Sequence, residues 1–235
     1  MNILFTTSAA PDKSPFFTSE KRPPLGMGGL MSLARDQGHT VFFIDNYLSP
    51  SKFIEDGYLQ SNSIDIVAIY ANTICFRDTK RMFHEIQSLR NEGSWSGKII
   101  VGGPHTSVAL ETIPDYVDHV VQGEGETAIV DLLEGNVTDR VITNDCIAEL
   151  DSLPFQPWDI FNELPYDFSC NWMDVQPVFT MNTSRGCPFK CTFCSVNSIW
   201  GKTYRYFSPG RIIAEIEYLI ENYNAKGIYF REDHF

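Results

Sequence analysis

Three cysteines in the C-terminal quarter of the chain are the residues best suited to chemistry. Cys187, Cys191 and Cys194 have the spacing C-x3-C-x2-C. This short spacing lets three thiolates from one loop converge on one metal centre. A structural zinc site normally has four protein ligands, and a [4Fe–4S] electron-transfer site also uses four cysteines. Three ligands instead indicate a cluster with one iron open to a non-protein ligand, which is typical of an enzyme.

Two other interpretations of these thiols stay open. A structural zinc site would need a fourth ligand, for which the chain offers Cys170 or His234. Unligated, reduced thiols are the other alternative. The chain has six cysteines, and in a reducing compartment these are better interpreted as metal ligands and free thiols than as disulfides. We expect Cys75, Cys146 and Cys170 to be ordinary thiols.

The segments around the three cysteines predict part of a parallel α/β barrel. Residues 177–183 read as a strand with an apolar, β-branched start. Ser208 and Pro209 are typical of a helix start, and Gly227 of the end of the helical region. The helix between them has apolar residues at helical spacing, namely Ile212, Ile213, Ile216, Leu219, Ile220 and Tyr223. A second strand follows at 228–230, so strand, loop, helix and strand form one barrel unit.

Barrel active sites lie at the C-terminal ends of the strands. The loop with the three cysteines follows the first of these strands, and the acidic pair Glu232 and Asp233 follows the second. We therefore expect the loop and the acidic pair on one face. A solvated charged turn is the alternative interpretation of the acidic pair.

The C-x3-C-x2-C loop, with Phe193 before its last cysteine, resembles the cluster motif of the radical S-adenosylmethionine (SAM) family. The resemblance implies that Cys187, Cys191 and Cys194 hold a [4Fe–4S] cluster whose fourth iron is chelated by SAM. It also implies that an electron from the cluster splits SAM, and that the resulting 5′-deoxyadenosyl radical abstracts hydrogen from a substrate. Phe193 would lie against the adenine. Glu232 or Asp233 would contact the SAM amino group, as a carboxylate suits an ammonium, and His234 would be a bystander.

The first half of the chain alternates between strand-like and helix-like segments. Helical patterns occupy 25–37, with Gly38 as its cap, 77–92 and a region around 128–133. Short apolar strands are predicted at 3–7, 41–44, 64–71, 98–101 and 119–121. This alternation predicts an α/β fold with a doubly wound, Rossmann-like parallel sheet. Ligands of such sheets bind at the carboxyl ends of the strands, near a topological switch point.

Glycines fall at two of these strand ends. Gly102 and Gly103 follow the fourth strand, and Gly123 and Glu124 follow the fifth. A glycine there lets the backbone come close to a flat ligand, although glycine also commonly just ends a strand. The sequence has no G-x-G-x-x-G after the first strand and no G-x4-G-K-[ST], which disfavours dinucleotide and P-loop nucleotide sites.

This half resembles the cobalamin-binding domain that precedes the barrel in one subgroup of radical SAM enzymes. The matching stretches are 33–41, 65–69, 101–105 and 121–126, with linker-like residues at 151–154 and 158–159. The resemblance implies that a corrin rests on Gly102, Gly103, Gly123 and Glu124 at the strand ends, with its nucleotide tail entering the sheet. Two features depart from the pattern. The D-x-H-x-x-G signature is absent after the first strand, and Tyr70 stands where a small serine is common. We do not expect His39 or His105 to be a cobalt ligand.

The domain organisation follows from these two resemblances. We expect a cobalamin-binding-like Rossmann domain at 1–140, a linker at 141–176 and the N-terminal part of a radical SAM barrel at 177–235. Because the chain ends soon after its cluster motif, we expect it to be a fragment that is catalytically weak or inactive alone.

Charge and hydropathy narrow the partners and the location. The formal net charge of −12 disfavours nucleic acid and anionic membranes as partners. The chain has neither a signal peptide pattern nor an apolar run long enough to span a membrane, so we expect a cytoplasmic protein.

The resemblance implies a cobalamin-dependent radical SAM enzyme with a small-molecule substrate and an external electron donor such as flavodoxin or ferredoxin. Methyl transfer to an unactivated carbon or phosphorus centre is the expected reaction, and cyclisation or rearrangement is the alternative. Two rivals are a cobalamin-independent radical SAM enzyme with a scaffold first domain, and a non-catalytic module that binds cobalamin or a cluster.

Overall fold

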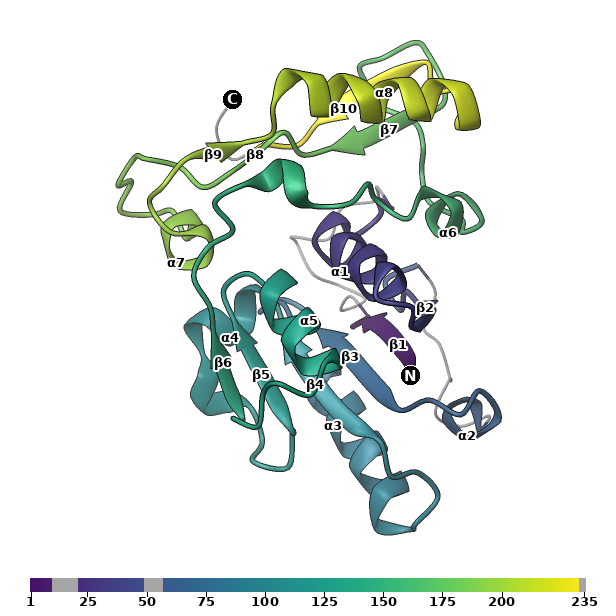
Figure 1. Ribbon diagram of the computed structural model, residues 1–235, viewed down its shortest axis with the longest axis vertical. Coiled ribbons are helices and arrows are strands. Elements are labelled where there is room, and N and C mark those ends of the chain that lie inside the picture. The colour runs from purple at the N-terminus through teal and green to yellow at the C-terminus, as the bar shows by residue number, and fades with distance from the viewer. Residues whose placement is uncertain (10–20, 49–56, 233–235) are drawn as a thin grey trace. The chain divides into compact units, whose positions relative to one another are not determined.

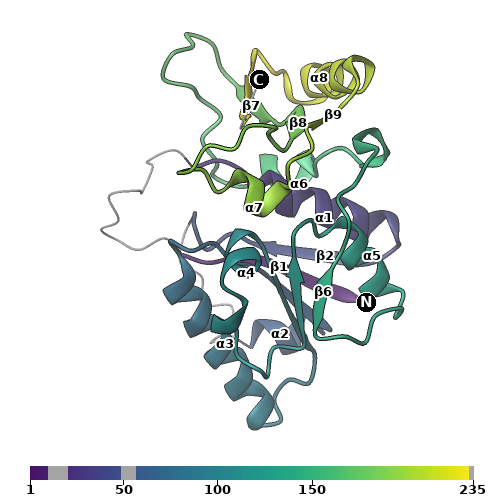
Figure 2. The same cartoon turned by 90° about the vertical axis from the view of Figure 1, so that its left-hand side faces the viewer.

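The computed structural model describes residues 1–9, 21–48 and 57–232, and these form two compact units (Figures 1 and 2). The first unit comprises Met1–Ser19 and Leu33–Asp145, and the second comprises Glu20–Ser32 and Cys146–Phe235. The boundary passes through helix α1 (Leu25–Asp36). Most of the predicted linker, from residue 146 onward, clusters with the second unit. The predicted domain boundaries stay a prediction.

A six-stranded parallel sheet forms the first unit, in the order β2-β1-β3-β4-β5-β6. This confirms the predicted doubly wound α/β fold. The order reverses direction between β1 and β3, which makes that position the topological switch point. The sixth strand was not predicted, because three residues are too few for a clear pattern. The strands are β1 (Asn2–Thr7), β2 (Thr40–Ile44), β3 (Ile66–Tyr70), β4 (Lys98–Gly102), β5 (His119–Gln122) and β6 (Val141–Thr143).

Helices cover both faces of this sheet. Figure 2 shows α3 on one face and α5 on the other. On α3, the side chains of Met82, Phe83 and Ile86 are fully buried and pack with strand residues such as Val67 and Ile99. Burying each such side chain contributes about 1.5–3 kcal/mol, so this layer is a main source of stability. Besides α1, the helices are α2 (Tyr58–Ser61), α3 (Phe76–Asn91), α4 (Pro104–Val108), the 3-10 helix η1 (Leu110–Thr112) and α5 (Glu126–Leu133).

The second unit contains the predicted strand, loop, helix and strand. Strand β7 (Val178–Met181) pairs in parallel with β10 (Gly227–Phe230), and α8 (Pro209–Tyr223) connects them. The short strands β8 (Ser184–Arg185) and β9 (Arg205–Tyr206) form a separate antiparallel pair. The remaining elements are the 3-10 helix η2 (Leu150–Ser152), α6 (Trp158–Asn162) and α7 (Val196–Trp200).

Both ends of α8 have identifiable causes. Ser208 is the predicted N-cap, and its hydroxyl accepts a hydrogen bond from the Arg211 amide at 3.2 Å. The prediction that Gly227 ends the helical region was wrong. The helix ends at Tyr223, and Asn224 adopts the left-handed conformation with φ 53°, a role that asparagine tolerates. Gly227 instead begins β10.

A buried aromatic and ionic core holds α8 in the second unit. Phe179 on β7 is fully buried, with its ring 5.3 Å from that of Trp158. The Trp158 indole donates to the Glu215 carboxylate at 3.0 Å, and Glu215 pairs with Arg211 at 2.8 Å. These contacts tie residues 155–158 to the helix, with the Arg211 guanidinium lying 4.0 Å from the ring centroid of Phe155. Across the described ranges, no helix is long and apolar enough to cross a membrane.

Candidate functional site

The loop that carries the three cysteines, residues 186–195 (the cluster loop), begins at a tightly packed position in the second unit. It follows β8, which is held in register against β9 by the pairs Ser184 with Tyr206 and Arg185 with Arg205. Gly186 then has φ 84°, and a Cβ at this position would lie 2.3 Å from the Thr203 carbonyl oxygen. Only glycine fits there, so the start of the loop is packed directly against the returning chain.

The cysteines have the character that cluster ligands need. All six cysteines of the chain are free thiols; Cys187 is half-buried, and Cys191 and Cys194 are exposed. Within the described ranges, no three His, Cys, Asp or Glu side chains gather around one point as a single metal ion would require. A [4Fe–4S] cluster makes a different demand, because each cysteine binds a different iron. Three accessible thiols on one short loop fit that donor set. Their role as ligands stays a prediction.

The zinc alternative gains no support from the described residues. Cys170 is buried and forms an isolated β-bridge with Met173, and it joins no group of three potential metal ligands in the described part of the chain. The other proposed fourth ligand, His234, lies outside the described residues.

The far end of the cluster loop continues into α7. The Cys194 amide donates to the Cys191 carbonyl oxygen at 3.1 Å, and the Asn197 side chain donates to the Phe189 carbonyl oxygen at 2.7 Å. These bonds close the loop on itself. Phe193 is 90% exposed, so its ring is accessible to a ligand. Its contact with adenine stays a prediction.

Glu232 lies directly after β10 and reaches the chain segment that precedes the cluster loop. Its carboxylate accepts hydrogen bonds from the Thr183 amide, from the Thr183 hydroxyl at 2.8 Å and from the Ser184 hydroxyl at 2.6 Å. The structure therefore brings a predicted acidic residue next to the start of the loop, as expected. Sequence reasoning missed Thr183 and Ser184, because their bonds to Glu232 join segments 49 and 48 residues apart in the chain. Asp233 lies outside the described residues.

In the first unit, Gly102 and Gly103 lie at the carboxyl end of β4. Gly103 has φ 115°, and a Cβ there would lie 2.7 Å from the Ala71 carbonyl oxygen and 3.0 Å from the Tyr70 ring. Glycine at 103 is thus required for packing β4 against the end of β3. A Cβ on Gly102 would meet Val121 at an ordinary 3.5 Å.

The next strand end is more open. Gly123 has φ 80°, and a Cβ built there meets no atom within 4 Å. Its amide donates to the Ser107 hydroxyl at 3.0 Å, and Glu124 beside it is buried. The four residues predicted to contact cobalamin therefore lie at the carboxyl ends of two adjacent strands, and Gly123 leaves space there for a flat ligand. The contacts themselves stay predictions.

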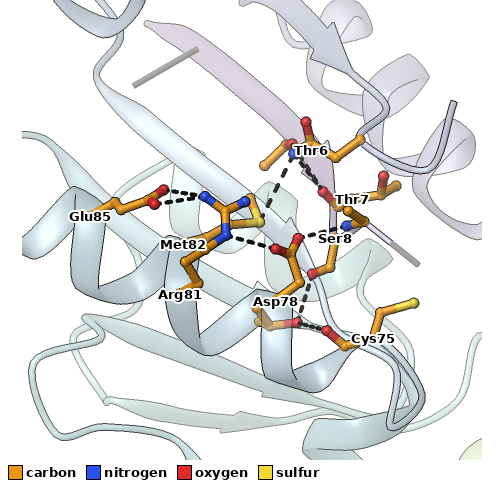
Figure 3. Close-up of polar contacts among 11 residues, drawn as sticks. Thr6, Thr7, Ser8, Cys75, Asp78, Arg81, Met82 and Glu85 are labelled. Atoms are coloured by element: carbon orange, nitrogen blue, oxygen red, sulfur yellow. Dashed lines mark hydrogen bonds and ion pairs between the residues drawn. The ribbon is translucent and has the colours of Figure 1, made fainter. Parts of the chain in front are cut away.

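A buried polar network occupies the switch point, at the carboxyl end of β1 and the start of α3 (Figure 3). The Thr7 hydroxyl donates to Asp45, the Ser8 and Thr79 hydroxyls lie 2.6 Å apart, and the Ala9 amide donates to Asp78 at 2.7 Å. Sequence reasoning did not single out these residues. Because these groups bond one another, the network braces the strand end against α3.

Two other groups at this edge have shifted pKa values. Burial raises the pKa of the Cys75 thiol, and the nearby carboxylates of Asp78 and Asp45 add to that effect. The His105 ring nitrogens lie 3.1 and 2.9 Å from the hydroxyls of Thr73 and Thr112. Burial lowers the pKa of His105, so this histidine is held neutral and is engaged on both sides.

The remaining candidate histidine is at the wrong edge of the sheet for a cobalt ligand. His39 precedes β2, at the amino end of the strand, and its Nδ1 lies 3.1 Å from the N-terminal amine. Ligands of such sheets bind at the opposite edge. That neither His39 nor His105 binds cobalt stays a prediction.

Comparison with known proteins links both halves of the chain to described families. Residues 20–133 match the B12 binding domain, and residues 181–231 match the Radical SAM superfamily. An uncharacterized methyltransferase of Pyrococcus horikoshii is 30% identical, with 91% of this chain and 49% of that protein covered. An anaerobic magnesium-protoporphyrin IX monomethyl ester cyclase of Cereibacter sphaeroides is 27% identical, with 88% and 36% covered. The chain spans about half or less of the length of these relatives.

Solved structures support the fold. The cobalamin-dependent S-adenosylmethionine radical enzyme OxsB, with aqua-cobalamin and S-adenosylmethionine bound, matches all of this chain and 34% of its own, with a TM-score of 0.79 and 19% identity. At that identity the likeness concerns the fold alone. The two domain matches, together with this fold, identify the family of the chain. The chain belongs to the radical SAM proteins that carry a B12-binding domain, whose cofactors are cobalamin, SAM and a [4Fe–4S] cluster.

Proposed function

We propose that this chain is part of a cobalamin-dependent radical SAM methyltransferase that acts on a small molecule. The observation that carries the proposal is the position of the cluster loop. The loop follows β7, and Glu232 follows β10, the parallel neighbour of β7. The Ser184 hydroxyl, just before the loop, donates to the Glu232 carboxylate. Barrel enzymes build their active sites at this edge. The B12-binding sequence in the same chain supports a second cofactor.

Each predicted residue has a role that its chemistry supports. Cys187, Cys191 and Cys194 would hold the cluster, and the exposed ring of Phe193 would lie against adenine. A carboxylate, that of Glu232 or Asp233, would bind the SAM ammonium group. The strand-end residues of the first unit, Gly102, Gly103, Gly123 and Glu124, would support the corrin. When bound, the cluster and SAM would supply a radical and cobalamin a methyl group, while the protein positions them and excludes water.

Methyl transfer to an unactivated carbon or phosphorus centre is the reaction that we favour. The P. horikoshii relative is named a methyltransferase, whereas the C. sphaeroides relative is named a cyclase, so ring closure is the alternative chemistry. The proposal also includes an external electron donor such as flavodoxin or ferredoxin and a cytoplasmic location.

The first test measures which cofactors the chain retains. The purified chain is incubated anaerobically with hydroxocobalamin, iron and sulfide, desalted, and analysed for cobalt, iron and sulfide per chain. We expect near-stoichiometric cobalt and about four irons. Iron without cobalt would support a cobalamin-independent enzyme with a scaffold first unit.

Cys191→Ala tests the cluster assignment in the same assay. We expect this variant to lose iron and sulfide and to keep cobalt, because only the cluster loop is changed. The matched control is Cys146→Ala, which removes another exposed thiol outside the loop. Full iron and sulfide in Cys191→Ala would show that the cluster assignment is wrong. SAM cleavage under a strong reductant then separates an enzyme from a non-catalytic binding module.

A further inference from the structure

The Glu232 carboxylate is engaged by the residues that lead into the cluster loop. It accepts from the Thr183 amide, from the Thr183 hydroxyl at 2.8 Å and from the Ser184 hydroxyl at 2.6 Å. These donors belong to one dipeptide, 49 and 48 residues earlier in the chain. A carboxylate has about four acceptor positions, so this dipeptide occupies three of them and leaves about one for a ligand such as the SAM ammonium group.

The dipeptide is also held from its other side. The Phe207 amide donates to the Thr183 carbonyl oxygen at 2.9 Å, and Ser184 pairs with Tyr206 between β8 and β9. The strand β10 that presents Glu232 is aligned with β7, with Phe230 opposite Met181. The carboxylate therefore joins the end of β10 to a chain segment that has defined backbone partners.

The cysteines lie immediately beyond this segment. Two residues after Ser184, the backbone of Gly186 is in such close contact with Thr203 that a Cβ would overlap its carbonyl oxygen at 2.3 Å. Cys187 follows directly. Because the chain between Ser184 and Cys187 is packed this tightly, a displacement of Thr183 and Ser184 would also move the Cys187 thiol.

We infer that Thr183, Ser184 and Glu232 form a clamp that sets the direction in which the cluster loop leaves the sheet. In this role Glu232 is a positioning residue of the cluster, and the two hydroxyls are its partners. The inference rests on the proposed function, because the clamp matters only if the three cysteines hold a cluster. A bond that merely secured β10 would affect stability and leave the cluster unchanged.

The test uses side-chain pairs that differ only in the hydroxyl. Thr183→Val and Ser184→Ala remove one donor each, whereas Thr183→Ser and Ser184→Thr keep it. Glu232→Gln removes the charge, and Glu221→Gln on the exposed face of α8 is its control. Each variant of the 235-residue chain is reconstituted anaerobically with iron and sulfide. The rate of iron loss to a chelator and the low-temperature EPR spectrum of the reduced cluster are then measured.

We expect all variants to take up a cluster, since the cysteines are intact. The three disruptive variants should lose iron on the order of tenfold faster, as the loss of a hydrogen bond to a charged group implies. Their EPR spectra should differ from the parent spectrum, and the hydroxyl-retaining variants should restore both properties. Combining Thr183→Val with Glu232→Gln should have less than the summed effect of the two single changes, because both weaken the same bond between the Thr183 hydroxyl and residue 232.

Parent-like rates and spectra in the disruptive variants, or fully additive effects in the double variant, would overturn the inference. If the parent chain takes up no iron, the proposed function fails, and the clamp's role for a cluster fails with it. Amide hydrogen exchange at Thr183 separates the two failures. Faster exchange in Glu232→Ala, which removes the acceptor of the Thr183 amide, would show that the clamp exists without a cluster, and unchanged exchange would show that it does not.

Discussion

Replacing Gly186 by alanine should disable the cluster loop while leaving most of the protein folded. The left-handed conformation at φ 84° costs an alanine about 1–2 kcal/mol. The new Cβ would also lie 2.3 Å from the Thr203 carbonyl oxygen, a backbone atom that is not free to rotate away. Relieving that overlap requires a shift of about an ångström between the loop start and residue 203. Together with the conformational strain, we expect a local cost of about 2–4 kcal/mol.

Gly201→Ala is the matched control for this prediction. Gly201 also has a positive φ, of 73°, but the nearest atom to a new Cβ is the Cys146 sulfur at 3.7 Å. With ψ −171° it lies in a backbone region that essentially only glycine adopts, so Gly201→Ala carries conformational strain of its own without the overlap. We expect Gly186→Ala to retain less than half of the parent's iron and sulfide after reconstitution, with circular dichroism unchanged, and Gly201→Ala to retain nearly all. Equal iron in the two variants would refute the reasoning, because the overlap is their main difference.

Two further predictions concern stability. Glu215→Leu leaves Arg211 buried without its ionic partner and removes the acceptor of the Trp158 indole, so the second unit should lose about 3–5 kcal/mol in denaturant unfolding followed by tryptophan fluorescence. Glu217→Leu, exposed on the same helix, should cost far less, and similar losses would contradict the buried pair. For His105, burial lowers the folded-state pKa below the unfolded value of 6.5, so the unfolded state binds more protons. Stability of the first unit should be complete above pH 6.5 and fall as the pH drops toward the folded-state pKa. His105→Gln should flatten this dependence, and an unchanged slope would assign it to other groups.

The fold could be predicted where elements are long. Strands β1 to β5 and helices α1, α3 and α8 each contain enough apolar residues at regular spacing to reveal their period. Strands β6, β8 and β9 have only two or three residues. Their pairing depends on partners elsewhere in the chain, and short segments carry no local signal of such partners.

The residues that could bind a cofactor were predictable from the sequence, whereas the residues that position them were not. The cysteine spacing and the acidic residue after β10 are local features of the sequence. The bonds from Thr183 and Ser184 to Glu232 span 49 and 48 residues and depend on the parallel register of β7 and β10. Threonine and serine after a strand are ordinary turn residues, so their chemistry alone does not identify a clamp.

The glycines at the strand ends show why a residue type cannot by itself identify a ligand contact. Gly103 and Gly123 read alike in the sequence, yet a Cβ would clash with the backbone at Gly103 and meet no atom within 4 Å at Gly123. Loss of cobalamin in Gly103→Ala would therefore reflect damage to the β3–β4 packing as readily as a lost contact. Gly102→Ala, with an ordinary 3.5 Å approach to Val121, leaves the sheet intact. The added methyl group would then mainly affect a ligand lying against β4. Residue 102 is therefore the more informative position for testing whether a corrin binds at this strand end.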